Sequence, residues 1–356
     1  MRRAMQEKSD RPAGEPLRIL VLQTAFLGDI ILTTPLLLAL KAAHPRSHLA
    51  LLTTPLGKAA LQGLPGLDEI ISYDKNGAER GIVSFFRKVR ELRGKKFEVA
   101  VSAHRSMRSA LLLLFAGVPV LVGFEDASFH WVYHLRVKRD REKHDVLRNL
   151  ALLAPVAALP KGFDPCLKLP LPPGFRLEKF GIGRTGKPLV GFAPGAAWPT
   201  KRWPAEKFGE LAGMLSSEPG ATVVLLGDKN DAGVCAEVIK SSPVQLTNLA
   251  GRTTVQELFG VVSNLDLLVC NDSAPAHIAS AFNVPAIVIF GPTTPRFGFG
   301  PWKNPHRILE KEMECRPCHH HGPVKCPEKH FRCMTEVGAG EAAKAARELL
   351  RAKRGG

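Results

Sequence analysis

The chain has 356 residues, and its 49 Lys and Arg against 33 Asp and Glu give a formal net charge of +16 at pH 7. This length is too great for one ordinary hydrophobic core and fits two domains. The charge favours anionic partners, but no helix-turn-helix, zinc-finger helix or aromatic-rich basic motif stands out, so nucleic acid is not predicted as a partner. An anionic membrane surface or a phosphorylated glycolipid explains the charge equally well.

The first 16 residues are polar and of mixed charge, so we expect 1–16 to be a disordered leader without the apolar core of a signal peptide. The longest apolar stretches, 30–40 and 111–122, are broken by Pro or Gly and are too short to span a bilayer. Four of the seven Cys cluster near the C-terminus, unlike a secreted disulfide framework. We therefore expect a cytoplasmic protein, either free or held peripherally at the inner face of a membrane by its surface.

The first half alternates apolar runs with helical patterns. Residues 17–23 predict a buried strand, and Gly28 and Asp29 open a helix over 30–43. Further strands are predicted at 48–53, 69–73, 99–102 and 120–124, with helices at 82–92 and 145–153. Strands that alternate with helices at this spacing indicate a parallel sheet, so we predict a Rossmann-like domain over 17–175.

The composition becomes rich in Pro and Gly between Pro155 and Pro188, and we place an interdomain linker at 176–187. The alternation then restarts. It predicts strands at 189–193, 222–226, 246–249, 265–270 and 286–290, and helices at 204–215, 231–240, 254–263 and 340–351. A second Rossmann-like domain is thus expected over 188–356, with a Cys-rich loop at 315–333 and a C-terminal helix. The predicted fold class is α/β, with two doubly wound domains facing a central cleft.

The most informative transition follows the apolar run 265–270. Asn271, Asp272 and Ser273 favour a helix N-cap, and Pro275 suits the first turn, so a strand should pass directly into a helix. A helix N-terminus beyond the carboxyl ends of parallel strands offers N–H groups to a phosphate. His277 lies about one turn further on. In the alternative interpretation the first residues only cap the helix and His277 is an interior histidine.

Three motifs occur in order, at 28–35 (GDIILTTP), 193–204 (APGAAWPTKRWP) and 271–277 (NDSAPAH). Together they resemble the glycosyltransferase family 9 heptosyltransferases of bacterial lipopolysaccharide synthesis. The resemblance implies a GT-B fold. It also implies transfer of heptose from ADP-L-glycero-D-manno-heptose to the inner core, with inversion at the anomeric carbon.

Such a transfer needs a base for the acceptor hydroxyl and a cation for the leaving diphosphate. The resemblance gives these catalytic roles to Asp29 and Lys201, although Asp29 also suits a helix cap. Arg202 either assists or lies on the surface. The resemblance implies that the nucleotide portion of the ADP-sugar is bound by Asp272, Ser273, Ala274 and His277, with Ala196 and Ala197 contributing backbone N–H groups and Asp231 lying near the ribose. Some family members carry hydroxyl residues where this chain has those two alanines.

No Asp-x-Asp pair of the kind that holds a metal-diphosphate is present, so catalysis is predicted to need no cofactor. A structural zinc ion is a separate prediction. Its candidate ligands are Cys315, Cys318, Cys326 and Cys333, with His319, His320, His321 and His330 as substitutes. A reduced thiol-rich loop or a local disulfide is the alternative, and similar cysteines occur in members resembling heptosyltransferase II.

Basic segments in the first half, namely Arg87, Lys88 and Arg90 and residues 136–143, are predicted to meet anionic groups of a lipid A–Kdo–heptose type acceptor or of the membrane. Ordinary solvated helix faces are the alternative. Two other functions stay open at this point. One is a family 9 transferase with another nucleotide sugar or acceptor, and the other is a non-catalytic nucleotide- or anion-binding protein.

Overall fold

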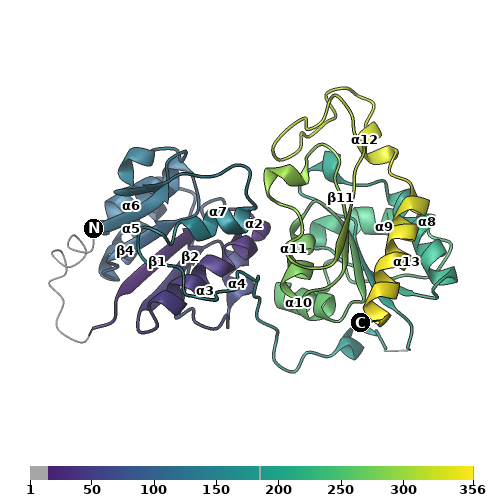
Figure 1. Ribbon diagram of the computed structural model, residues 1–356, viewed down its shortest axis with the longest axis horizontal. Coiled ribbons are helices and arrows are strands. Elements are labelled where there is room, and N and C mark those ends of the chain that lie inside the picture. The colour runs from purple at the N-terminus through teal and green to yellow at the C-terminus, as the bar shows by residue number, and fades with distance from the viewer. Residues whose placement is uncertain (1–14, 184–185, 356) are drawn as a thin grey trace. The chain divides into compact units, whose positions relative to one another are not determined.

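A computed structural model describes residues 15–183 and 186–355 (Figure 1). Contacts divide the chain into two compact units, the first ending at Pro170 and the second beginning at Leu171. The segment predicted as a linker therefore belongs to the second unit, where part of it forms the 3-10 helix η2 (Leu177–Phe180). The predicted leader lies outside the described residues up to residue 14, and so do residues 184–185 of the linker.

The first unit is built on a six-stranded parallel sheet with the order β3-β2-β1-β4-β5-β6. Its strands are β1 (Arg18–Gln23), β2 (His48–Thr53), β3 (Glu69–Ser72), β4 (Val99–Ser102), β5 (Val120–Phe124) and β6 (Leu135–Val137). Its helices are α2 (Leu27–Leu32), α3 (Thr34–Ala43), α4 (Pro55–Leu61), α5 (Ile82–Gly94), α6 (Met107–Ala116) and α7 (Asp145–Ala151), with the 3-10 helix η1 (His130–Val132). The strand order reverses between β1 and β4, which makes their carboxyl ends the switch point where ligands bind in such sheets.

The second unit repeats this topology with the order β12-β11-β10-β7-β8-β9. Its strands are β7 (Leu189–Ala193), β8 (Thr222–Leu225), β9 (Thr247–Asn248), β10 (Leu267–Asn271), β11 (Ala286–Ile289) and β12 (His306–Leu309). Its α-helices are α8 (Ala205–Ser217), α9 (Ala232–Ser241), α10 (Val255–Ser263), α11 (Ala274–Ala281), α12 (Arg332–Thr335) and α13 (Ala339–Gly355), and its remaining 3-10 helices are η3 (Pro199–Lys201), η4 (Lys229–Asp231) and η5 (Pro295–Phe297). The switch point lies between β7 and β10, which pair in parallel.

Both cores follow from the apolar runs of the sequence. β1 and β10 are central strands whose neighbours pair with them on both sides, and each is buried almost throughout. In the second unit α13 packs on α8, and its Ala-rich face lets the two helices approach closely (Figure 1). The prediction of two Rossmann-like halves is confirmed.

One predicted helix, 30–43, is wrong in its limits, because the structure has two helices that meet at Thr33. Pro35 has no N–H to donate to the carbonyl of Ile31, and the hydroxyl of Thr34 donates to that carbonyl at 2.8 Å instead. The hydroxyl of Thr33 likewise donates to the carbonyl of Asp29 at 2.8 Å. The break leaves α2 as a short helix directly after β1, with Asp29 in its first turn.

No helix among the described residues combines the length and the apolar character needed to cross a bilayer.

Candidate active site

The switch point of the second unit brings Lys201 and Asp272 together. Lys201 ends η3, which follows β7, and Asp272 follows β10. The Lys201 Nζ lies 2.6 Å from Asp272 Oδ2, and the two side chains are only 13% and 10% exposed. The hydroxyl of Thr293, beyond β11, donates to the same carboxylate oxygen at 2.7 Å. The ammonium is thus held at a fixed place at the carboxyl edge of the sheet.

Asn271, which is fully buried, positions the loop that carries Lys201. Its side-chain oxygen accepts the backbone N–H of Trp203 at 3.0 Å, and its amide donates to the carbonyl of Pro194 at 2.8 Å. The Trp203 indole donates to the carbonyl of Val337 at 3.0 Å and so ties the loop to the segment before α13. Sequence reasoning treated Asn271 only as a capping residue. The feature that could have revealed its positioning role is an amide side chain at the end of an otherwise apolar strand.

Arg202 and Asp231 support the turn after β7. The Arg202 guanidinium donates twice to the carbonyl of Ala196, at 3.0 and 2.9 Å, so the arginine braces the loop rather than lying free on the surface. The Asp231 carboxylate lies so close to Gly195 that a Cβ there would stand 2.0 Å from Asp231 Oδ1. Burial raises the pKa of Asp231. Because position 195 is glycine, the Asp231 carboxylate can lie directly beside the turn after β7, which is the candidate phosphate-binding loop.

The residues after Asp272 have different environments. Ser273 is the N-cap of α11, but within the described part of the chain its hydroxyl donates to the carbonyl of Asn271 at 3.2 Å and caps no helix N–H. Ala274 begins the helix. His277 is only 4% exposed, and its predicted role in nucleotide binding stays a prediction. The capping-only interpretation is wrong for Asp272, because its carboxylate pairs with Lys201.

Asp29 lies at the switch point of the first unit, in the first turn of α2. Its Oδ2 accepts the backbone N–H of Phe26 at 3.2 Å, so the predicted capping role is present as well. Burial and the nearby Asp145 carboxylate together raise the pKa of Asp29 to about 6, although backbone N–H groups and Arg139 oppose the rise. A carboxylate with this pKa is ionised at neutral pH and is more basic than an ordinary aspartate.

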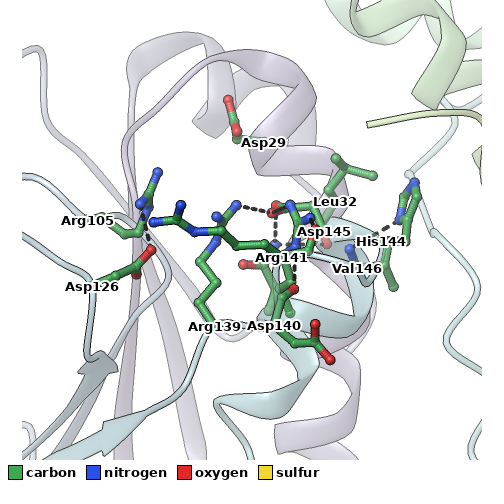
Figure 2. A network of polar contacts seen from close by, with 12 residues as sticks. Asp29, Leu32, Arg105, Asp126, Arg139, Asp140, Arg141, His144, Asp145 and Val146 are labelled. Carbon is green, nitrogen blue, oxygen red and sulfur yellow. Dashed lines mark hydrogen bonds and ion pairs between the residues drawn. The ribbon is translucent and has the colours of Figure 1, made fainter. Parts of the chain in front are cut away.

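The charged network beside Asp29 centres on Asp145 (Figure 2). Asp145 Oδ1 accepts from Arg139 at 3.0 Å and from Arg148 at 3.5 Å, and Asp145 Oδ2 accepts from Asn149 at 3.1 Å. The Asn149 amide also donates to the carbonyl of Leu32 at 3.4 Å, which joins α7 to the end of α2. Arg139 belongs to the basic segment predicted to meet an acceptor, but its guanidinium pairs with Asp145 and so stabilises the structure near Asp29.

The three basic residues of α5 do not form one surface. Arg87 and Arg90 are exposed, as predicted for residues that meet an anionic partner. The prediction is wrong for Lys88, because its side chain is buried and already has partners in the protein. Its ammonium donates to the carbonyl of Ser72 and to Glu91, both at 2.7 Å, and lies 3.3 Å from Glu79. A helix of 3.6 residues per turn directs Lys88 away from its two basic neighbours.

The Cys-rich loop packs beside the candidate active site. Across residues 15–183 and 186–355, no three His, Cys, Asp or Glu side chains group as metal ligands would. Cys318 Sγ instead donates to the carbonyl of Cys315, and burial raises the pKa of the Cys333 thiol to about 11. The candidate residues do not fit a zinc ion in this arrangement, so structural zinc stays a prediction without support from ligand geometry.

Arg316 is a residue of this loop that sequence reasoning missed. Its guanidinium donates to the carbonyls of Gly291 and Thr293 after β11, the latter at 2.9 Å, and pairs with Glu310 at 2.8 Å. The loop also reaches η3, where the Thr200 hydroxyl donates to the carbonyl of Pro323. The Cys-rich loop is therefore joined to both segments that hold Lys201 and Thr293.

Two Rossmann-like units, with a fixed lysine–carboxylate pair at the switch point of the second, define an α/β protein of the nucleotide-binding class. The sequence profile of glycosyltransferase family 9 (heptosyltransferase) matches residues 85–329, which is more than half of the chain. The chain belongs to glycosyltransferase family 9 and is an enzyme.

Known relatives agree with this placement. The chain is 29% identical over 298 residues to lipooligosaccharide heptosyltransferase 2 of Haemophilus influenzae, covering 79% of this chain and 85% of the relative. It is 27% identical to lipopolysaccharide heptosyltransferase 2 of Escherichia coli K12 over 79% of this chain and 84% of the relative. A family 9 glycosyl transferase of Veillonella parvula superimposes with a TM-score of 0.84 at 25% identity, covering 94% and 97% of the two chains. The structure of E. coli ADP-heptose heptosyltransferase II, at 24% identity, has the same GT-B fold with a TM-score of 0.79 over 95% and 100%.

Proposed function

We propose that this enzyme is an inverting transferase that moves heptose from ADP-L-glycero-D-manno-heptose to the inner core of lipopolysaccharide. The main support is the Lys201–Asp272 pair, a positioned cation at the place where a Rossmann-like unit receives a nucleotide diphosphate. The names of the similar heptosyltransferases support the choice of sugar and acceptor.

In the proposed reaction the acceptor hydroxyl gives its proton to the Asp29 carboxylate while its oxygen attacks the anomeric carbon. The bond between that carbon and the β-phosphate oxygen breaks, and ADP leaves from the opposite face, which inverts the configuration. The Lys201 ammonium and the first turn of α11 balance the charge that develops on the diphosphate. Backbone N–H groups of the Ala196 loop bind the diphosphate, and Asp231 accepts hydrogen bonds from the ribose hydroxyls.

The proposed chemistry needs no metal, because an ammonium and a helix N-terminus neutralise the leaving group. We expect transfer to continue undiminished in excess chelator. Complete loss of activity that Mg²⁺ restores would contradict this part of the proposal.

The test of the proposed function is incubation with a panel of ADP-, UDP- and GDP-sugars and truncated core acceptors, followed by mass spectrometry of the product. We expect product with ADP-heptose and a core acceptor. Asp29→Asn and Lys201→Met should each lower kcat about 100-fold or more, while Arg46→Gln, an exposed cation in the first unit, should leave it unchanged. Transfer of another sugar, or full activity of Asp29→Asn, would refute the assignment.

We also propose that the enzyme works at an anionic bilayer, reached through exposed side chains of α5 and α6. Ile82, Val83 and Phe86 of α5 and Leu114 and Phe115 of α6 are exposed, and we call them the apolar cluster. The rings of Phe86 and Phe115 lie 6.1 Å apart, so the two helices present one surface. Arg87 and Arg90 are exposed on the same helix, and Arg93 donates to the carbonyl of Phe115. Apolar side chains beside cations suit an anionic lipid interface.

A further inference from the structure

A second group of polar side chains lies at the switch point of the first unit, apart from Asp29. Thr24 directly follows β1, and His104 follows β4, so both lie at the carboxyl edge of the sheet where its strand order reverses. Lys75 comes from the loop after β3. None of these residues was singled out by the sequence analysis, because three separate loops supply them.

The His104 imidazole is held by hydroxyl groups. Its Nδ1 lies 2.7 Å from the Ser109 hydroxyl, 3.1 Å from that of Thr24 and 3.2 Å from that of Ser106. Burial, with help from Lys75 and Arg105, lowers the pKa of His104 to about 4, so the ring is neutral at pH 7. The environment of this histidine is therefore already cationic.

Lys75 supplies most of that positive character. Its Nζ donates to the Thr24 hydroxyl at 3.3 Å, and no carboxylate in the described part of the chain lies within ion-pair distance of it. Because an ammonium can only donate, the Thr24 hydroxyl oxygen accepts from Lys75. The same hydroxyl also contacts His104 Nδ1, so Thr24 links the ammonium to the neutral ring.

Two further features add positive potential. Arg108 donates to the Tyr73 hydroxyl at 2.7 Å and to the carbonyls of Glu79 and Arg80, both at 3.0 Å, so its partners are neutral groups. Ser106 is the N-cap of α6, a helix of 10 residues whose positive end lies at this edge. A half-buried ammonium without a counterion is unfavourable unless an anion joins it.

We infer that Lys75, Thr24, His104 and the N-terminus of α6 form a binding site for an oxyanion, a carboxylate or phosphate group carried by the acceptor saccharide. The identity of the saccharide rests on the proposed function, whereas the oxyanion site does not. Lys75 supplies the positive charge, the Thr24 hydroxyl orients the ammonium, and the neutral His104 ring adds a polar group that carries no charge of its own. The site fixes the acceptor in the same unit that carries Asp29.

The site itself is tested by inorganic phosphate, with ADP at saturating concentration so that the second unit is occupied. We expect phosphate to raise the Tm of the wild-type protein by about 2–5 °C relative to chloride at equal ionic strength. Lys75→Met and Thr24→Val should lose most of that rise, and Lys161→Met, an exposed lysine of the same unit, should keep it. An equal rise in wild type and Lys75→Met would overturn the inference, as would no rise in wild type.

The role of the acceptor is tested by steady-state kinetics with an intact core acceptor and one from which carboxylate and phosphate groups have been removed. Lys75→Met should raise the KM of the intact acceptor about 10- to 100-fold and change that of the stripped acceptor little. Its affinity for ADP should be unchanged. An equal loss with both acceptors would exclude an oxyanion site. Absence of transfer by the wild-type enzyme would refute the proposed function and leave the phosphate result standing.

Discussion

In the proposed mechanism, Asp29 is the base and so determines how the rate depends on pH. Its half-buried carboxyl lies near Asp145, and the pKa of about 6 means that the basic form dominates only above that pH. We expect kcat/KM to rise about tenfold per pH unit below pH 6 and to level off above it. Initial rates between pH 4.5 and pH 9 would show this, with ADP binding measured in parallel as the control. A profile that levels off below pH 5 would mean that another group accepts the proton.

The same shift predicts how stability changes with pH. The folded pKa of Asp29 lies above its unfolded value of 3.8, so the stability that comes with protonation is fully present below pH 4 and is lost as pH rises through 6. Asp29→Asn removes the buried charge, and at pH 8 it should stabilise the protein by at most about 3 kcal/mol. Urea unfolding at pH 8 and at pH 4 would test this. The gain should be nearly absent at pH 4, and a gain of equal size at both pH values would contradict the assigned cause.

Single residues were predictable from the sequence where a motif places them beside a strand end. Asp29, Lys201 and Asp272 lie beside strand ends, as expected from the motifs, and their assigned catalytic and binding roles stay predictions. Lys88 was assigned wrongly, because a basic run along a helix does not reveal that a backbone carbonyl and two carboxylates meet one of its members. Such convergence depends on tertiary contacts.

Among the elements, most strands and helices were predicted, including the edge strands β3 and β9, but the edge strands β6 and β12 were not. β6 and β12 have three and four residues and lie at the ends of their sheets, where alternation is too short to detect. The break at Thr33 was also missed, although Pro35 was its visible cause. The structural zinc ion predicted for the Cys-rich loop stays a prediction, and the contacts of this loop with the segments that hold Lys201 and Thr293 were not predicted.

That bracing role leads to a prediction for Arg316. Replacing it with Gln removes the guanidinium that holds the carbonyls of Gly291 and Thr293 and leaves buried acceptors without donors. We expect Arg316→Gln to weaken ADP binding about 10-fold or more and to destabilise the protein by about 2–4 kcal/mol. Calorimetric ADP titration and urea unfolding measure the two effects.

The matched control for that variant is Arg332→Gln, in the same part of the chain, whose guanidinium pairs with Glu336 on the surface. It should change stability by less than about 1 kcal/mol and leave ADP binding intact. Normal ADP affinity in folded Arg316→Gln would show that the loop does not support the nucleotide site.

For the whole molecule, the repeated alternation of apolar runs made two similar halves evident in the sequence. Both sheets are parallel, as predicted. The net charge of +16 was equally plain, but it did not identify a partner. The fold adds that exposed apolar side chains of α5 and α6 lie beside exposed arginines of α5, the surface on which the proposed membrane contact depends. Sequence periodicity alone missed this surface, because α6 was not predicted as a helix.

The exposed apolar side chains and arginines of α5 and α6 predict that the protein binds to vesicles that contain anionic lipid. Vesicles with an anionic lipid should capture it in flotation at low salt, and neutral phosphatidylcholine vesicles should capture much less. Arg87→Gln with Arg90→Gln should remove the salt-sensitive part of binding, at about 1 kcal/mol per charge. Phe86→Ser with Ile82→Ser should reduce the part that survives high salt, because less apolar area enters the interface. Val324→Ser, an exposed apolar residue of the second unit, is the control and should bind as wild type does. Equal capture of all these variants would place membrane contact, if any, on another surface.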